Sequence, residues 1–376
     1  MKKKLVVFAI SNRGGGSETF LINFLKRFSK LSKYEITCFL PEERKSHYEE
    51  IIDNVVYVYI SKIVVDNPMK RLIYENFTAK KIINKIKPDI IFIPSESIPY
   101  SWNKINCIKI TNVHSTIQVS SYKSFFTRTI RENYDYFIRK RSLKISNYIV
   151  FVSYLSLAEI KFKFAIDEAK TTVIYHGVNF DGQNYARFDK YGDYILSVGD
   201  RYEHKNYDKM IVLFAKLLKM YSLNIKLLII GRKKSSSVEK KLSNIIEEYN
   251  LMDKVVFLDS VTYNDIGVYY KNAKLYMNTS SWESFGITPL EAMSYSIPCI
   301  AFKHSALAEI YSDKLQFLDP SIESDIEMVS KLHKMITDNH LRSRYIDLGT
   351  EFAHKMNWDS SIDKYIIYFE RIEGSK

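Results

Sequence analysis

Short continuous apolar runs alternate with amphipathic stretches along almost the whole chain. Strands buried on both faces have such uninterrupted apolar sequences, whereas helices repeat apolar residues every three or four positions. In the first half, the pattern predicts helices over 16–30 and 68–87, and strands at 3–10, 34–40, 55–60, 89–94, 107–113, 148–153 and 172–178. The alternation indicates a parallel sheet with helices on both faces.

The same pattern restarts after a polar stretch, residues 179–191, whose composition is typical of a linker. Beyond it we predict helices near 207, 237, 263, 286 and 325, and strands at 194–198, 226–230, 254–258, 274–278, 298–302 and 315–318. A chain of 376 residues is also too long for one ordinary core. The predicted fold class is therefore α/β, with two Rossmann-like, doubly wound parallel-sheet domains.

Composition excludes several other classes of protein. The chain is 46% hydrophobic and therefore globular rather than disordered. The apolar run at residues 5–10 imitates a signal peptide but is too short, and we predict a buried strand there. No run approaches the roughly 20 apolar residues of a membrane-spanning helix. Cys38, Cys107 and Cys299 lie in apolar strand patterns without metal-ligand spacing, which predicts three buried, reduced thiols in a cytoplasmic protein.

The basic excess of the chain, a formal net charge of +12, belongs to its first half. Residues 1–190 contain 31 Lys and Arg against 18 Asp and Glu, and residues 101–150 alone contain 9 against 2. Aromatic residues are interleaved with the cations of this stretch: Tyr122, Phe125, Phe126, Tyr134, Tyr136 and Phe137. A basic, aromatic helix could lie on an anionic membrane surface. A solvated helix with an aromatic stripe in the core and a nucleic-acid-binding module are the alternatives.

Residues 274–310 carry the clearest chemical signal, because they predict a strand, a short loop, a helix and another strand. Glu283 precedes the helix and Glu291 lies within it. Between them, the backbone N–H groups of residues 285–287 are the unpaired donors of a helix start, where the macrodipole is positive. Phosphate suits such a helix start, and ribose or hexose hydroxyls suit the carboxylates. The pattern therefore indicates a site for a sugar nucleotide.

The same segment resembles the retaining glycosyltransferases of family four, also called group 1. Glu283 and Glu291 match the E-x7-E motif of that family, and the flanking Ser284-Phe285-Gly286 and Pro289-Leu290-Glu291-Ala292-Met293 match its surroundings. The resemblance implies the GT-B arrangement, with the site in a cleft between two domains. It further implies an acceptor-binding domain over 1–180, joined by the closing helix 359–376, and a domain over 190–357 that binds the nucleotide sugar.

The resemblance also implies roles for residues at the ends of other predicted strands. Arg201 and Lys205 align with the basic pair that holds the diphosphate in the family, although an alignment on Asp200 is the alternative. His114 aligns with a histidine that faces the donor sugar, and with Glu283 these residues form the expected catalytic group. The expected donor-binding residues are Gly15, Gly16, Arg201, Lys205, Gly231, Val261, Glu283, Ser284, Phe285, Gly286, Ile287, Thr288 and Glu291.

The expected function is retaining transfer of a hexose from a nucleoside diphosphate sugar, in the first instance a UDP-sugar, to a hydroxyl of a glycan or polyprenyl-linked acceptor in bacterial surface polysaccharide synthesis. The chain contains no Asp-x-Asp and no His-Glu-x-x-His, so we expect neither a metal nor another cofactor. The expected location is cytoplasmic, with a peripheral position on the inner membrane face left open. A sugar-nucleotide epimerase of the same fold is the alternative, and a nucleic-acid-binding protein is less favoured. The residues specify neither the sugar nor the oligomeric state.

Overall fold

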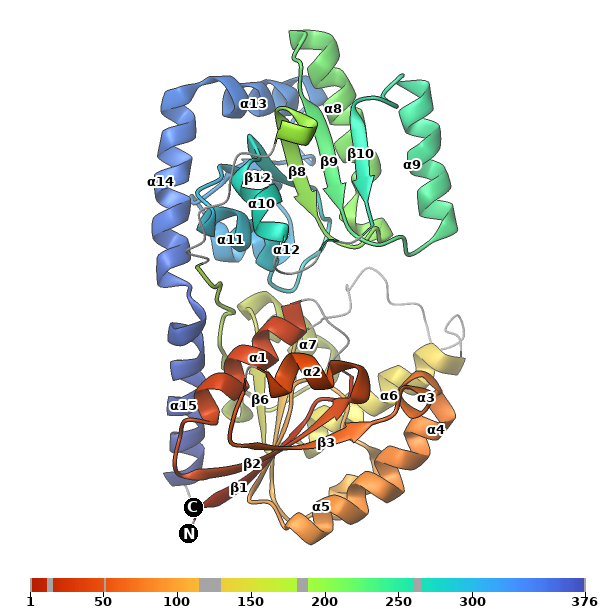
Figure 1. Ribbon diagram of the computed structural model, residues 1–376, viewed down its shortest axis with the longest axis vertical. Coiled ribbons are helices and arrows are strands. Elements are labelled where there is room, and N and C mark those ends of the chain that lie inside the picture. The colour runs from red at the N-terminus through yellow and green to blue at the C-terminus, as the bar shows by residue number, and fades with distance from the viewer. Residues whose placement is uncertain are drawn as a thin grey trace. The chain divides into compact units, whose positions relative to one another are not determined.

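The computed structural model describes residues 2–11, 16–50, 52–114, 130–180, 189–259, 261 and 265–374. The chain divides into two compact units, which Figure 1 shows as ribbons. Unit 1 comprises residues 1–176 and 358–376, and unit 2 comprises residues 177–357. Each unit contains one parallel sheet with its own helices, which confirms the predicted α/β fold class with two Rossmann-like sheets.

The sheet of unit 1 has seven strands in the order β3-β2-β1-β4-β5-β6-β7, and every neighbouring pair is parallel. The strands are β1 (Lys3–Phe8), β2 (Tyr34–Pro41), β3 (Val55–Ile60), β4 (Ile90–Ile93), β5 (Ile108–Val113), β6 (Tyr148–Phe151) and β7 (Thr171–Val173). The central residues of β1, β2, β4, β5 and β6 are buried, whereas those of the edge strands β3 and β7 are partly exposed.

The main helices of unit 1 connect these strands. They are α1 (Gly16–Phe28), α2 (Lys45–Glu49), α3 (Lys62–Asp66), α4 (Pro68–Ile73), α5 (Lys80–Ile86), α6 (Ile130–Ile145), α7 (Tyr154–Phe164) and α15 (Trp358–Gly374). The predicted helix over 68–87 consists of α4, a π-helical turn, η2 (Tyr74–Ala79), and α5 in direct succession. α7 begins with a capping box, in which the Ser153 hydroxyl accepts from the Ser156 N–H at 3.1 Å.

Aromatic contacts fix the closing helix α15 against α1. The Phe24 ring stacks on Phe28 with centroids 4.0 Å apart, and the Phe28 ring meets Phe369 edge-on at 5.1 Å. Tyr365 of α15 is also fully buried, and its hydroxyl accepts from Asn112 Nδ2 at 2.8 Å. The C-terminal helix therefore completes the core of unit 1, although all of unit 2 separates it from the rest of this unit in the sequence.

The sheet of unit 2 has six parallel strands in the order β10-β9-β8-β11-β12-β13. The strands are β8 (Tyr194–Val198), β9 (Lys226–Ile230), β10 (Val255–Leu258), β11 (Leu275–Asn278), β12 (Cys299–Phe302) and β13 (Gln316–Leu318). The helices are α8 (Tyr207–Tyr221), α9 (Ser236–Glu248), α10 (Ile266–Lys271), α11 (Ile287–Ser294), α12 (Ser305–Tyr311), α13 (Asp325–Thr337) and α14 (Asn339–Lys355). The strand order reverses between β8 and β11, which lie side by side.

Two expectations change in detail. The three cysteines carry free thiols, but only Cys38 and Cys299 are buried, whereas Cys107 is half-buried because it lies just before β5 rather than within it. Most of the predicted linker, residues 181–188, lies outside the described residues, as do Tyr122, Phe125 and Phe126. None of the described helices combines the length and apolar composition needed to cross a membrane.

Candidate active site

Two loops of unit 2 leave the carboxyl ends of adjacent strands where the strand order reverses. The loop after β8 carries Lys205, and the loop after β11 carries Glu283. In open parallel sheets, ligands bind beyond the carboxyl ends of the strands at such a switch point. The topology therefore brings both predicted residues to the edge at which this type of sheet binds ligands.

Lys205 and Glu283 form an ion pair between these loops. Lys205 Nζ donates to Glu283 Oε1 at 2.6 Å, and the two side chains are only 17% and 14% exposed. The Ser280 hydroxyl donates to the same oxygen at 2.7 Å. Although burial raises the pKa of the Glu283 carboxyl, the Lys205 charge and these hydrogen bonds bring it below its usual value. Glu283 is therefore a carboxylate at neutral pH.

Further hydrogen bonds hold the two loops together. The Thr279 hydroxyl donates to the Lys205 carbonyl at 2.9 Å, and the Asn206 side-chain amide donates to the Thr279 carbonyl at 3.1 Å. The Ser281 N–H donates to the His204 carbonyl at 2.8 Å. The ion pair therefore stands on a fixed backbone, as a preorganised charged site requires.

The start of α11 lies against Glu283. Gly286 is its N-cap, with a left-handed φ of 76°, and a β-carbon there would lie 2.3 Å from Leu307 Cδ2. The same position lies 3.6 Å from Glu283 Cγ. No hydrogen bond from the side chain of the N-cap satisfies the first N–H groups of the helix. The positive end of α11 is therefore beside the Lys205–Glu283 pair, in the part of the chain that the structure describes.

The remaining members of the predicted motif are built into the same loop and helix. Ser284 and Phe285 are buried, whereas Ile287 is half-buried. Thr288 Oγ1 accepts from Tyr276 Oη at 2.7 Å. Glu291 Oε2 accepts from Tyr270 Oη at 2.9 Å, and burial raises the pKa of the Glu291 carboxyl. The two glutamates of the motif thus differ, because only Glu283 has a cation beside it.

Arg201 lies in a different setting from the one expected. Its side chain is 0% exposed, and Nε donates to Glu239 Oε1 at 2.8 Å. Nη2 donates to Asp259 Oδ1 at 2.7 Å, and Nη1 donates to the Gly231 carbonyl. The guanidinium carbon also lies 5.0 Å from the centre of the Phe257 ring. The expectation that Arg201 offers its guanidinium to a phosphate does not fit this geometry, because these contacts tie the ends of β8, β9 and β10 together.

Gly231 allows the ends of β8 and β9 to approach closely. A β-carbon at this residue would lie 1.9 Å from the Gly199 carbonyl oxygen, a distance that only glycine avoids. Beside it, Asp200 accepts from Arg232 Nη2 at 2.8 Å and from Lys234 Nζ at 3.0 Å. Although burial raises the pKa of Asp200, these cations and their hydrogen bonds lower it to about 2. Asp200 therefore gathers two cations next to the strand ends.

His114 lies at the carboxyl end of β5 in unit 1, where both of its ring nitrogens have protein partners. Asn112 Nδ2 lies 3.1 Å from His114 Nε2, and His176 Nε2 lies 3.2 Å from His114 Nδ1. Because the Asn112 amide is the donor, the imidazole of His114 accepts at Nε2 and donates from Nδ1. Burial lowers the pKa of His114 to about 4 and that of His176 well below its usual value. Both histidines are therefore neutral at physiological pH.

This neutral pair predicts that the protein loses stability in mild acid. Below about pH 6.5 the unfolded chain binds a proton at each histidine that the folded chain does not, so stability falls until pH reaches the folded value of about 4. For His114 the total loss is about 3 kcal/mol. Urea unfolding between pH 7 and pH 4.5 measures it. The decline should be smaller in His114→Gln and unchanged in His340→Gln, an exposed control; an identical decline in both variants would contradict the assignment.

The hydrogen bonds and ion pairs described above do not include the other predicted donor-binding residues, Gly15, Gly16 and Val261. Gly15 lies outside the described residues, and Gly16 is the first residue of α1. Val261 is half-buried beyond the end of β10. Across the described ranges, no group of three or more His, Cys, Asp or Glu side chains is arranged to hold a metal ion.

Two family models match the chain almost from end to end. The model described as Glycosyltransferase Family 4 matches residues 14–181, and the model described as Glycosyl transferases group 1 matches residues 183–352. The chain belongs to the group 1 glycosyltransferases of family 4. It is a GT-B glycosyltransferase, as the resemblance of the segment around Glu283 and Glu291 implied.

Individual relatives of this glycosyltransferase agree with the family. It is 28% identical over 228 residues to the O-antigen chain mannosyltransferase RfbU of Salmonella typhimurium. The match covers 60% of this chain and 62% of RfbU, so it spans less than two thirds of the length of that relative. It is 24% identical to an uncharacterized glycosyltransferase of Methanocaldococcus jannaschii over 95% of each chain. Its fold matches the crystal structure of Anabaena HepE in complex with UDP and glucose, with a TM-score of 0.77 and 14% identity, over 98% of this chain and all of the other.

The structure connects two further residues to the predicted ones of this glycosyltransferase, His176 and Glu239. His176 follows β7 at the same sheet edge as His114, so a histidine at the end of an apolar run was the available signal. Glu239 holds Arg201 from the first turn of α9, and its spacing from Arg201 carried no signal.

Proposed function

We propose that this glycosyltransferase moves a hexose from a nucleoside diphosphate sugar, in the first instance a UDP-sugar, to a hydroxyl of a glycan or polyprenyl-linked acceptor in surface polysaccharide synthesis. The anomeric configuration is retained, and no metal takes part. The observation that carries the proposal is the Lys205–Glu283 pair beside the start of α11, at the switch point of unit 2. The UDP and glucose bound in the HepE structure and the O-antigen role of the Salmonella relative support the choice of donor and acceptor.

Lys205 supplies the charge that the reaction needs. In the transition state, positive charge develops on the anomeric carbon and negative charge on the departing diphosphate. An ammonium group and an open helix start stabilise that negative charge without moving, because the loops that carry them are hydrogen-bonded together. We therefore assign the diphosphate to Lys205 and residues 286–288.

Glu283 and Glu291 suit the hydroxyl groups of the donor. Glu283 is ionised and accepts hydrogen bonds, so it orients hexose hydroxyls beside the diphosphate. Glu291 lies one turn into α11 and accepts from ribose hydroxyls. The leaving phosphate takes the proton of the acceptor hydroxyl on the same face of the sugar, so no side chain acts as a nucleophile.

The two units have separate roles in this proposal. Unit 2 binds the donor, and unit 1 binds the acceptor. The expected role of His114 toward the donor sugar stays a prediction, because Asn112 and His176 already occupy both of its ring nitrogens and hold the ring in one tautomer. Arg201 acts as a positioning residue, because it fixes the backbone from which the loop with Lys205 begins.

Proton NMR of the product tests the proposed reaction. UDP-glucose, UDP-galactose, UDP-N-acetylhexosamine and GDP-mannose are incubated with the protein, with and without a polyprenyl-linked acceptor. We expect one donor to be consumed with release of its nucleoside diphosphate, and the transferred sugar to keep the α configuration of that donor. A β product would contradict retention, and an isomerised donor formed without an acceptor would identify an epimerase instead.

We also predict that turnover continues in the presence of EDTA. The cations of the site, Lys205 and the helix start, take the place that a divalent metal would have beside the diphosphate. The initial rate of transfer, measured after dialysis against EDTA, should remain within about twofold of the untreated rate. Loss of activity that Mn²⁺ or Mg²⁺ restores would contradict this part of the mechanism.

A further inference from the structure

The helical segment of residues 68–86 in unit 1 presents an unusual row of exposed side chains. Met69, Ile73 and Phe77 follow at intervals of four and are 65%, 52% and 71% exposed. The same interval continues with Lys81 and Lys85, which are also exposed. The row is therefore apolar over its first half and cationic over its second half.

A π-helical turn in the middle of the segment keeps this row on one side. In a regular α-helix, positions four apart drift by about 40° at each step, and the wider turn of η2 reduces the drift. The carbonyls of η2 accept from a neighbouring element, since Trp102 Nε1 donates to the Glu75 carbonyl at 2.8 Å and the Ser101 hydroxyl donates to the Asn76 carbonyl at 2.8 Å. These hydrogen bonds hold the segment that carries the exposed row in place.

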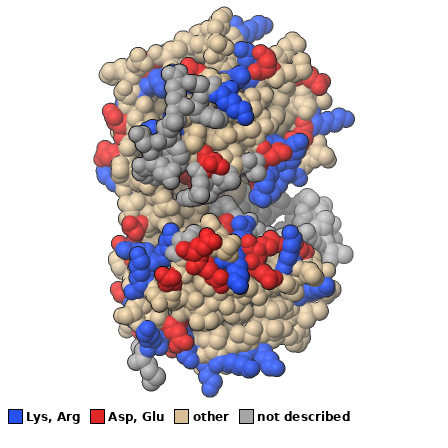
Figure 2. All heavy atoms as spheres, viewed as in Figure 1, with Lys and Arg blue, Asp and Glu red and all other residues tan. Residues whose placement is uncertain are grey.

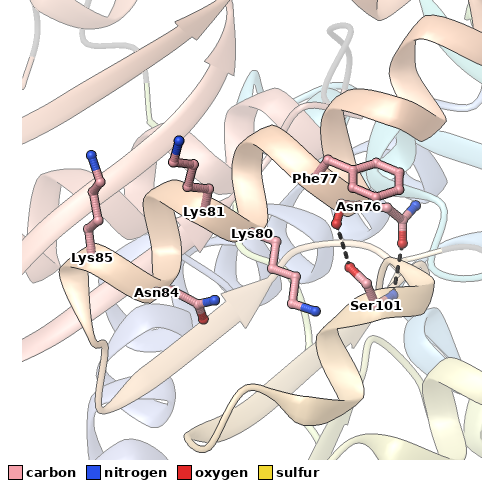
Figure 3. Close-up of a pocket in the computed structure, with 7 residues that line it drawn as sticks. All are labelled: Asn76, Phe77, Lys80, Lys81, Asn84, Lys85 and Ser101. Atoms are coloured by element: carbon pink, nitrogen blue, oxygen red, sulfur yellow. Dashed lines mark hydrogen bonds between the residues drawn. The ribbon is translucent and has the colours of Figure 1, made fainter.

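Figure 3 shows how the cationic half is arranged. Lys81 and Lys85 project to the same side of α5, whereas Lys80 points toward Ser101. A shallow hollow of about 430 Å³ lies between Phe77, these lysines and Ser101. Figure 2 shows Lys and Arg side chains along the foot of this unit, where Figure 1 places α5.

The surface is larger than the row itself. Ile63 and Leu72 are exposed beside it, so five of the eighteen exposed large apolar side chains of the described chain fall within residues 63–77. Lys70, Lys80, Lys81 and Lys85 form no ion pair with any described residue. Clustered apolar exposure of this kind marks an interaction site rather than ordinary surface.

We infer that residues 62–87, which we call the docking face, bind an anionic membrane surface. The apolar side chains enter the boundary between headgroups and acyl chains, while the lysines stay at the level of the anionic headgroups. A second copy of this chain fits less well, because a two-fold contact would oppose the lysines either to lysines or to apolar side chains. A nucleic acid would leave Met69 and Ile73 without a partner. The inference is independent of the proposed reaction, since it requires no donor or acceptor.

This position differs from the one that the sequence indicated. A membrane contact by residues 101–150 stays a prediction, because residues 115–129 lie outside the described residues. On α6, two described arginines have protein partners. Arg139 Nη2 lies 3.3 Å from Glu96 Oε2, and Arg141 lies over the Tyr100 ring at 4.5 Å. Lys140 and Lys144 of α6 are exposed, so this stretch and the docking face are separate candidates for the contact.

Co-sedimentation of the full-length protein with vesicles tests the inference. We expect binding to phosphatidylcholine vesicles that contain phosphatidylglycerol, little binding to phosphatidylcholine alone, and weaker binding as the salt concentration rises. Each lysine near an anionic surface strengthens binding about fivefold, so Lys81→Ala combined with Lys85→Ala should weaken it about 25-fold. Phe77→Ala should weaken it about tenfold.

Matched variants separate the docking face from general charge and exposure. Lys219→Ala combined with Lys240→Ala removes the same charge from exposed positions of unit 2. Phe162→Ala removes an 85% exposed phenylalanine of α7 that also lies between two lysines. These controls should bind vesicles like the wild type, and circular dichroism should show all variants folded. Equal losses in controls and docking-face variants, or no binding of the wild type to anionic vesicles, would overturn the inference.

Discussion

Replacement of Lys205 by alanine is expected to lower kcat/KM by about 100-fold or more. The ammonium is the one cation that the structure places against Glu283 and the start of α11 among the described residues, so its loss leaves the departing diphosphate without a fixed positive charge. The effect should appear mainly in kcat, because the charge that Lys205 balances is greatest in the transition state. Steady-state assays with the donor identified by NMR measure it.

The same substitution also changes the acid limb of the pH profile. Without Lys205, the largest influence that opposes burial is lost, so the pKa of Glu283 rises and activity declines at a higher pH as the medium is acidified. Lys219→Ala, at an exposed position in the last turn of α8, is the matched control and should leave both the rate and the profile unchanged. A Lys205→Ala variant with near-normal kcat/KM would remove the diphosphate role from this residue.

Replacement of Arg201 by alanine is expected to destabilise unit 2 by about 3 kcal/mol. The variant loses three hydrogen bonds of a fully buried guanidinium, leaves the Gly231 carbonyl without this donor, and opens a cavity beside Phe257. Much of the charge on Asp259 regains water, since that side chain is exposed, which keeps the cost below that of a wholly buried pair. Thermal unfolding should show a midpoint lower by about 6 to 12 °C.

The unfolding midpoint and the turnover together show whether Arg201 positions the loop or contacts the phosphate. Well below the unfolding temperature, Arg201→Ala should retain more activity than Lys205→Ala, because its effect reaches the diphosphate only through the loop after β8. Arg344→Ala, at an exposed position of α14, controls for the loss of an arginine and should unfold like the wild type. An unchanged midpoint combined with a 100-fold loss of turnover would show that Arg201 contacts the phosphate after all.

The arrangement of strands and helices could be predicted because the pattern of neighbouring residues indicates most of the elements. Most buried parallel strands are continuous apolar runs, and the helices between them carry apolar residues on one face. The buried strand β5 is an exception, because it contains Lys109, Thr111 and Asn112. The site around Glu283 was also local, since the strand, the loop, Gly286 and α11 lie within a short segment. The helix start beside Glu283 therefore follows from a few neighbouring residues.

The setting of Arg201 could not be predicted in the same way. Its partners Glu239 and Asp259 lie 38 and 58 positions away, and only the folded sheet brings them together. The spacing of residues 68–87 predicts a helix but not the π turn that aligns Ile73 and Phe77, because the turn depends on contacts from η3 (Tyr100–Lys104). Long-range polar contacts of this kind leave no pattern in a single sequence.

Titration calorimetry with nucleoside diphosphates tests the central claim most directly, namely that Lys205 and the start of α11 form a site for the diphosphate of a sugar nucleotide. We predict that the wild-type protein binds UDP or GDP at one site without added metal, that Lys219→Ala binds it equally well, and that Lys205→Ala binds it at least about tenfold more weakly. Absence of binding to either nucleotide in the folded wild-type protein, or equal affinity in Lys205→Ala, would contradict the account.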